Sequence, residues 1–247
     1  MQPPPLPASD AVGRAGNTNF IKVTTMKLTN SKHNSLYNKL RNDYKYLEII
    51  DKFICIARDL NYPIFKSNDK YPINLNIWGI RSKDSSTKYF NDVIAVFYNY
   101  PNADYDDWCL RLYEATTDPS DINLKKPVSN KGCAILPEGY HKALWKIGSH
   151  KSQYQALVQA NPCQVIRDRN YDDVLDFENT FDFGMFGINC HRASSTKIQD
   201  EIGHYSAGCQ VFKDVFEFTN DFMPLCKKAI GKSTQSYILI NELDLDL

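Results

Sequence analysis

The sequence predicts a mainly β (α+β) fold, built as a β-sandwich or closed sheet with helical segments before and after it. Three observations predict this fold class. Short apolar or alternating segments recur at close spacing between residues 73 and 191, with turn-forming stretches between them, which favours antiparallel sheets over βαβ units. Helical periodicity precedes these segments at 31–60 and follows them at 212–230. Hydrophobic residues make up 43% of the 247 residues, which is sufficient for a packed core.

The first 30 residues are rich in Pro, then in Gly, Asn and Thr, and show no hydrophobic periodicity. We expect a flexible leader over 1–30, with Met26 as an alternative start. The leader contains no apolar run of the kind that a secretory signal peptide has. No segment of the chain approaches the ~18 consecutive apolar residues of a membrane span. We therefore expect synthesis in the cytoplasm and no transmembrane segment.

A helical segment is predicted over 31–62. Apolar residues recur there at steps of three and four, Ser31 is a candidate N-cap, and Asn61, Tyr62 and Pro63 form a stop. We expect one or two amphipathic helices that pack on the main domain. A separate helix that binds a partner is the alternative.

The main domain is expected over 63–247. A turn and a loop are predicted at 117–131, a polar turn at 168–173, and a helix that ends before Gly231 at 212–230. Alternating or continuous apolar runs predict strands at 73–78, 93–98, 108–116, 133–136, 154–159, 164–169, 184–191 and 236–240.

Charge and cysteine usage exclude several classes of protein. Lys plus Arg and Asp plus Glu both number 29, so there is no basic excess and we expect no nucleic-acid partner. The seven cysteines are dispersed without C-x-x-C spacing, which favours reduced thiols over disulfides or a zinc site. We expect six of them to be small buried core residues. Neither a metal nor an organic cofactor is implied.

The seventh cysteine, Cys209, is the candidate nucleophile. It follows Ser206, Ala207 and Gly208, and His191 precedes it by eighteen residues at the end of an apolar run. An imidazole can take the proton of a thiol, and glycine permits a tight turn next to it. The amides of Gly208 and Cys209 are candidates for an oxyanion hole, while the hydroxyl of Ser206 either orients the imidazole or donates to the oxyanion.

This pattern resembles the L,D-transpeptidase catalytic domain, in which a histidine precedes a Ser-His-Gly-Cys-x-Arg segment at nearly this distance. The upstream segment Pro137-Glu138-Gly139-Tyr140 is similar to the strand entry of that family, and the resemblance covers about 108–211. The chain departs from the family at Ala207, where it has histidine, at Val211, where it has arginine, and at Arg192, where glycine is usual. The resemblance implies that Cys209 forms a thioester and that His191 acts as its base.

Further residues near these motifs are candidates for contact with a substrate. Tyr140 belongs to the family-like entry, and His204 and Tyr205 either line a pocket or cap the loop before the turn. Arg192 is a candidate carboxylate contact in place of the missing arginine, because a guanidinium pairs with a carboxylate through two hydrogen bonds. A further aromatic and imidazole-rich segment forms either a cleft wall or an exposed hairpin; it contains His141, Trp145 and His150.

The resemblance implies peptidoglycan stem peptides as the partner. The acyl group would pass from Cys209 to an amine, as in an L,D-transpeptidase, or to water, as in a carboxypeptidase or endopeptidase. Without an export signal, such a protein would reach the cell wall after lysis or with a virus particle, as a viral lysin does. The alternative is a catalytically inactive protein that keeps the fold and serves as a wall-binding or virion-associated structural component. A papain-like peptidase is disfavoured because its cysteine precedes its histidine.

Overall fold

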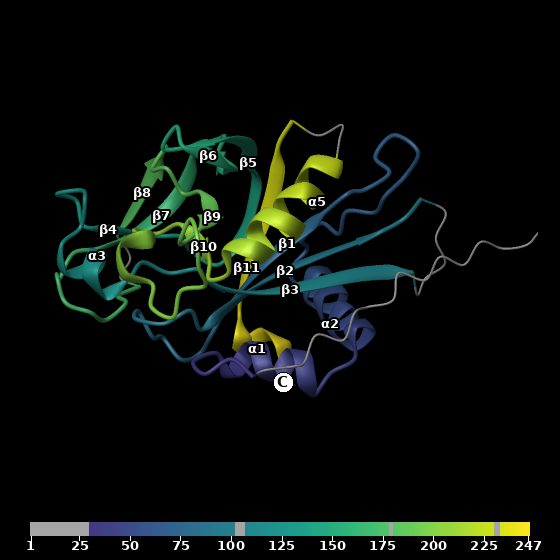
Figure 1. Ribbon diagram of the computed structural model, residues 1–247, viewed down its shortest axis with the longest axis horizontal. Helices are drawn as coiled ribbons and strands as arrows, with labels where there is room; N and C mark the ends of the chain where they lie inside the picture. The colour runs from purple at the N-terminus through teal and green to yellow at the C-terminus, as the bar shows by residue number, and fades with distance from the viewer. Residues whose placement is uncertain (1–29, 102–106, 178–179, 230–232) are drawn as a thin grey trace, which may run out of the picture. The chain divides into compact units, whose positions relative to one another are not determined.

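Eight strands close into a barrel, drawn at the centre of Figure 1. The computed structural model describes residues 30–101, 107–177, 180–229 and 233–247, and residues 31–247 form one unit. The expected leader therefore lies outside the described residues, except for Asn30. Around the barrel the strand order is β1-β11-β5-β6-β9-β10-β3-β2. The expectation of a mainly β fold with a closed sheet is confirmed.

Two of the neighbouring strand pairs are parallel, β1 with β11 and β9 with β10, and the other six are antiparallel. This pairing brings the ends of β1, β3, β6 and β11 to the same end of the barrel as the starts of β2, β5, β9 and β10. We call it the Arg81 end. The strands are β1 Asn76–Arg81, β2 Asp92–Asn99, β3 Trp108–Thr116, β5 Gly139–His150, β6 Tyr154–Gln159, β9 Cys190–Arg192, β10 Gln210–Phe212 and β11 Gln235–Asn241.

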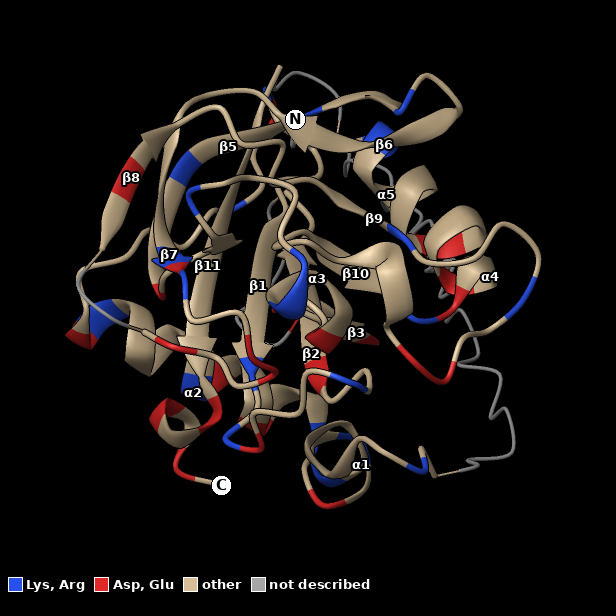
Figure 2. Ribbon diagram, turned by 90° about the vertical axis from the view of Figure 1, so that its left-hand side faces the viewer, with Lys and Arg blue, Asp and Glu red and all other residues tan. Residues whose placement is uncertain are grey.

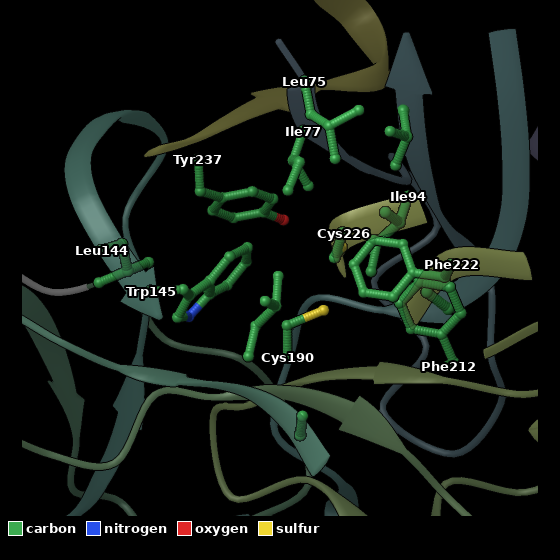
Figure 3. Close-up of a cluster of buried hydrophobic side chains, with 14 of the residues drawn as sticks. Leu75, Ile77, Ile94, Leu144, Trp145, Cys190, Phe212, Phe222, Cys226 and Tyr237 are labelled. Atoms are coloured by element: carbon green, nitrogen blue, oxygen red, sulfur yellow. The ribbon is translucent and has the colours of Figure 1, made fainter. Parts of the chain in front are cut away.

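Strands β1 and β2 are buried on both faces, which explains why the sequence of β2 is apolar without alternation. Their inward side chains join the barrel core, where the Trp145 and Tyr237 rings lie 4.5 Å apart between centroids (Figure 3). Their outward side chains pack on two helices, α1 Ser35–Asn42 and α2 Tyr46–Asp59. Phe53 of α2 lies 4.9 Å from the ring of Trp78. The expected helical segment thus forms two helices, and its N-cap is Asn34 rather than Ser31.

A small second sheet lies beside the barrel, with strand order β4-β7-β8. It consists of β4 Cys133–Ile135, β7 Cys163–Asp168 and β8 Phe181–Gly184. A short helix, α3 Asp121–Lys125, packs against it through Leu124, although the sequence predicted only turn and loop there. The hydroxyl of Ser120 accepts a hydrogen bond from the amide of Asn123 and caps this helix.

The helical region predicted at 212–230 begins later, because its first residues form β10. It comprises α4 Val215–Glu217, a π-turn at Phe218–Phe222 and α5 Met223–Lys228. Phe218 and Phe222 are fully buried, and Phe222 lies 4.6 Å from the ring of Phe212 in the barrel core (Figure 3). A 3-10 turn at Glu242–Leu245 follows β11. None of the helices within the described ranges is long and apolar enough to cross a membrane.

All seven cysteines are free thiols, as expected. Four of the six expected core cysteines are buried, namely Cys133, Cys163, Cys190 and Cys226. The expectation is wrong for Cys55, which is exposed on α2, and for Cys109, which is half-buried on β3. Cys55 stands on the solvent side of an amphipathic helix, where a small thiol is tolerated in water, whereas Cys109 packs against the barrel core but remains partly exposed.

Candidate active site

Strands β9 and β10 are neighbours in the sheet (Figures 1 and 2); β9 carries the candidate base, His191, and the candidate nucleophile, Cys209, immediately precedes β10. His191 pairs with Val211, and Cys190, whose side chain enters the barrel core, pairs with Gln210. Alternation along both strands then puts the side chains of His191, Val211 and Cys209 on the opposite face from that of Cys190. Cys209 is half-buried and packs beside Val211. The two predicted catalytic side chains are therefore diagonal neighbours on one face of a parallel pair.

The turn before β10 is closed by Ser206, whose side chain is fully buried. Its hydroxyl donates to the carbonyl of Cys209 at 2.8 Å and accepts from the amide of Gly208 at 3.3 Å. Gly208 has a φ of +112°, and a Cβ atom there would lie 2.1 Å from the carbonyl oxygen of Ala134. Only glycine satisfies both conditions. Ser206 thus shapes the turn and does not contact the imidazole, and the Gly208 amide already has an acceptor.

The orientation of His191 is determined by backbone and aromatic neighbours. Its Nδ1 lies 2.8 Å from the carbonyl oxygen of Arg192, which can only accept, so Nδ1 carries the hydrogen and Nε2 has a free lone pair. The hydroxyl of Tyr154 donates to the same carbonyl at 3.2 Å. On the other side, the ring of His150 stacks on His191 at 4.1 Å between centroids. Nδ1 of His150 lies 3.1 Å from the side-chain amide of Asn189, which donates to it.

Both members of the dyad are uncharged at neutral pH. Burial lowers the pKa of His191 to about 3, and the neighbouring His150 lowers it further in the same direction. Burial also raises the pKa of the Cys209 thiol, against the opposing effects of the Asn189 backbone and the positive charge of Lys151. In the described part of the chain the thiol donates to the carbonyl of Gly187 at 3.3 Å, and no hydrogen bond links it to His191. Proton transfer to Nε2 must then accompany the attack of the sulfur on a substrate.

The segment before His191 was predicted as a strand over 184–191, but only its last two residues belong to β9. The reason is Gln159, whose side-chain oxygen accepts hydrogen bonds from three successive amides, those of Phe186, Gly187 and Ile188, at 2.7–3.0 Å. These bonds curl the backbone and aim the carbonyl of Gly187 at the thiol. Gly187 itself has a φ of +75°, and this glycine is the only sequence signal of the curl.

The structure brings some of the predicted contact residues to the dyad. Arg192 lies with its guanidinium carbon 3.9 Å from the ring centroid of Tyr154, and it donates to the carbonyl of Ser194. His150 reaches the dyad directly, as described. Tyr154, Asn189 and Gln159 also reach it, but the sequence offered no motif for any of them.

Other predicted residues lie elsewhere. Tyr140 belongs to the outer core with α2, where its ring is 6.4 Å from that of Tyr62. His141 bonds to the carbonyl of Pro137 at 2.9 Å, and the indole of Trp145 donates to the carbonyl of Ile188, so Trp145 supports the site from within the core. His204 is exposed, and Tyr205 is exposed with its hydroxyl accepting from Gln199 at 3.3 Å. These last two residues flank the Cys209 turn on its solvent side.

A cavity of about 430 Å³ opens at the Arg81 end of the barrel, and neither Cys209 nor His191 lines it. Arg81 forms its floor and is 4% exposed on its side chain. The guanidinium donates to Asp118 at 2.8 Å and to the carbonyl of Leu136 at 3.0 Å, and its Nη1 lies 3.8 Å from Oε1 of Glu138. The Cys209 side chain packs with Val211 on the face of the sheet opposite the barrel core.

Comparison with known proteins gives no relative for this chain. A scan against protein-family models, a search of curated proteins and a search of solved structures each found no match.

Proposed function

We propose that the chain is a cysteine-dependent acyltransferase or peptidase of the L,D-transpeptidase kind. One observation carries the proposal: a half-buried cysteine immediately before β10 lies on the same face of the sheet as a histidine of the adjacent parallel strand β9, and the tautomer of that histidine is set. A nucleophile, a base and a group that orients the base are the parts that covalent acyl transfer requires. Here the orienting group is the backbone carbonyl of Arg192.

The reaction proceeds in two halves. The Cys209 sulfur attacks an amide carbonyl as its proton passes to Nε2 of His191, and the resulting imidazolium donates that proton to the departing amine. The thioester formed is then attacked by a second amine, or by water, which gives a proton to His191. The C–S bond breaks, and His191 passes that proton to the released thiolate of Cys209. Before the first attack, the thiol must leave its hydrogen bond to Gly187, which requires only rotation of the cysteine side chain. The Arg192 carbonyl stabilises the imidazolium through Nδ1 in each half.

We propose peptidoglycan stem peptides as the substrate, on the strength of the Ser-x-Gly-Cys pattern after His191. Arg192 is the proposed contact for a substrate carboxylate. Its guanidinium covers the ring of Tyr154, and the Tyr154 hydroxyl lies 3.4 Å from Nδ1 of His191. The site would act at the cell wall, after lysis or after delivery with a virus particle.

The test uses a carbapenem, because its strained β-lactam amide acylates a thiol that is activated for acyl transfer. Intact-mass spectrometry after brief exposure should show one adduct, which peptide mapping places on Cys209. The adduct should disappear in Cys209→Ala and form much more slowly in His191→Gln. Cys55→Ser is the matched control, since Cys55 is more exposed than Cys209 and should be irrelevant. An adduct that maps to Cys55, the more solvent-exposed cysteine, and not to Cys209 would refute the proposal.

A positive result would lead to a stem tetrapeptide, supplied with and without an amine acceptor. Loss of the terminal D-amino acid with formation of a cross-linked product indicates transfer, and loss with uptake of water indicates hydrolysis.

A second candidate is an inactive protein that keeps the fold and binds the cell wall or forms part of a particle. The observation that favours it is the raised pKa of Cys209 together with the bond of its thiol to Gly187. In that case Cys209 would alkylate no faster than the half-buried Cys109, and His191→Gln would leave the rate unchanged. Sedimentation with purified peptidoglycan would then be the informative assay.

A further inference from the structure

The loop that follows β7 presents acidic and amide side chains at regular intervals. Asp168, Asn170 and Asp172 alternate with other residues, and Asp176 follows four positions later. This spacing corresponds to positions 1, 3, 5 and 9 of an EF-hand loop, which supply oxygen ligands to Ca²⁺. The backbone is different, because an EF-hand turns at a glycine in position 6, whereas here Tyr171 in position 4 has the positive φ, +63°. The loop therefore shares the ligand spacing but has its own turn.

The carboxylate of Asp168 is the central observation. The residue is 2% exposed, and its Oδ2 accepts from the amide of Asp176 at 3.0 Å. Its Oδ1 is buried and has no hydrogen-bond partner among the described residues. A buried carboxylate oxygen without a partner is unfavourable, and such atoms in proteins are satisfied by donors or cations.

The charges around Asp168 are of the same sign. Asp172 and Asp176 carry the same charge as Asp168. Lys125 pairs with Asp173 at 2.8 Å. Within the described ranges no Lys or Arg forms an ion pair with Asp168, Asp172 or Asp176. The three carboxylates therefore lack a positively charged partner among the described residues.

The side chain of Asn170 lies between two of the carboxylates. Its amide nitrogen donates to Asp172 at 2.9 Å and also to Asp176. As the side chains now lie, no group of three or more His, Cys, Asp or Glu residues in the described chain is arranged to hold a metal ion. A cation between Asp172 and Asp176 would displace the amide nitrogen, and rotation of the Asn170 amide would present its oxygen instead.

We propose that this loop binds Ca²⁺ through the side-chain oxygens of Asp168, Asn170, Asp172 and Asp176. An all-oxygen set in an irregular loop suits Ca²⁺, whereas Mg²⁺ requires near-octahedral geometry, and zinc would require His or Cys. The site is independent of the proposed acyl transfer. It does connect to the Cys209 turn, because Asp168 pairs with Cys133 in β4 and the next residue, Ala134, lies against Gly208. Ca²⁺ should therefore stabilise the small sheet that supports the turn.

Thermal unfolding of the full chain tests the proposal, after treatment with EGTA. We expect about 5 mM CaCl2 to raise Tm by about 4 °C or more, and isothermal titration with CaCl2 to give one site. Equal ionic strength of KCl should have no such effect, and MgCl2 should have a much smaller one. No rise with CaCl2, or an equal rise with MgCl2 or KCl, would overturn the proposal.

Two variants locate the effect in the loop. Asp172→Asn changes an exposed side chain and should fold, yet it should weaken Ca²⁺ binding at least about tenfold. Asp168→Asn removes the buried charge, so its Tm in EGTA should equal or exceed that of the wild type, while its response to Ca²⁺ should vanish. Asp69→Asn, on an exposed turn outside this loop, is the matched control and should bind as the wild type does. An unchanged response in Asp172→Asn would show that Ca²⁺ binds elsewhere.

Discussion

Two clusters of buried ionisable side chains, one around Arg81 and one around His191, differ in how fully their polar atoms are hydrogen-bonded. In the first, Arg81 pairs with Asp118, and Asp92 accepts three hydrogen bonds, from the amide of Ser82 and from the amide and hydroxyl of Thr117, at 2.6–2.8 Å. In the second, His191 is uncharged, stacks on His150 and bonds through one ring nitrogen only. The first cluster contains a guanidinium paired with a carboxylate, whereas the second is neutral and leaves Nε2 of His191 with a free lone pair.

This difference distinguishes a cluster that stabilises the fold from a cluster that is a candidate for catalysis. The Arg81 cluster joins the ends of β1 and β3 to the start of β2, so its bonds hold the barrel together. The His191 cluster receives its orientation from a carbonyl and from stacked rings, which leave Nε2 available. A buried ionisable group is thus a candidate for catalysis when its partners fix its direction but do not use all its bonding capacity.

The largest effect should come from Arg81→Met. It leaves the carboxylates of Asp118 and Asp92 buried without their cation, and we expect a loss of about 3–5 kcal/mol in the free energy of unfolding, measured with urea. Arg111→Met is the control, because Arg111 is 41% exposed and pairs with Asp221 at 3.5 Å, so its loss should be below about 1 kcal/mol. Similar losses in the free energy of unfolding for the two variants would mean that the Arg81 cluster contributes no more to stability than an exposed ion pair.

The next effect concerns the turn of the second cluster. Gly208→Ala places a Cβ atom against the Ala134 carbonyl at a φ of +112°, and we expect a loss of about 2–3 kcal/mol together with loss of Cys209 acylation. Gly203→Ala separates the two causes, since Gly203 has a φ of +54° but open space around its Cβ position, and about 1 kcal/mol is expected. If both variants lose the same stability, the contact with Ala134 is unimportant.

The smallest effect is a dependence on pH. The pKa of His191 is about 3 when folded and about 6.5 when unfolded, so the folded chain binds fewer protons. The stability linked to the neutral imidazole is complete above pH 6.5 and falls by about 1.4 kcal/mol for each unit below it, until the folded pKa is reached. The free energy of unfolding, measured with urea at several values between pH 7 and 5, should therefore fall less for His191→Gln than for the wild type. Parallel curves would mean that the imidazole is not held neutral. His141, with a pKa of about 4, offers a second comparison.

Local patterns predicted much of the fold. The strands at 108–116 and 154–159 and the two N-terminal helices follow directly from hydrophobic periodicity. Barrel closure, which depends on the pairing of β1 with β11 across most of the chain, has no local signal. Helix α3 was missed because five residues are too few to show a period, and its capping by Ser120 depends on tertiary position.

The candidate site divides in the same way. Cys209, Gly208 and His191 are recognisable because chemistry and a left-handed turn constrain residue type and spacing. Gln159 and Tyr154 act through hydrogen bonds to distant backbone atoms, and such bonds leave no pattern in the neighbouring sequence. Ser206 was predicted to orient the imidazole or to donate to the oxyanion, whereas its hydroxyl closes the turn.

The parallel pairing of β9 and β10 gives a meaning to the distance between His191 and Cys209 in the sequence. Parallel neighbours cannot be joined by a hairpin, so the chain must travel back to the starting end of the sheet before β10 begins. The eighteen-residue interval contains that return path, and a connection between parallel strands requires about a dozen residues or more, so the interval has no single required value. Extra residues inserted among the exposed positions 195–198 would lengthen the path without moving either strand. Searches for distant relatives should accordingly allow the interval to grow while holding Ser-x-Gly-Cys and the histidine fixed.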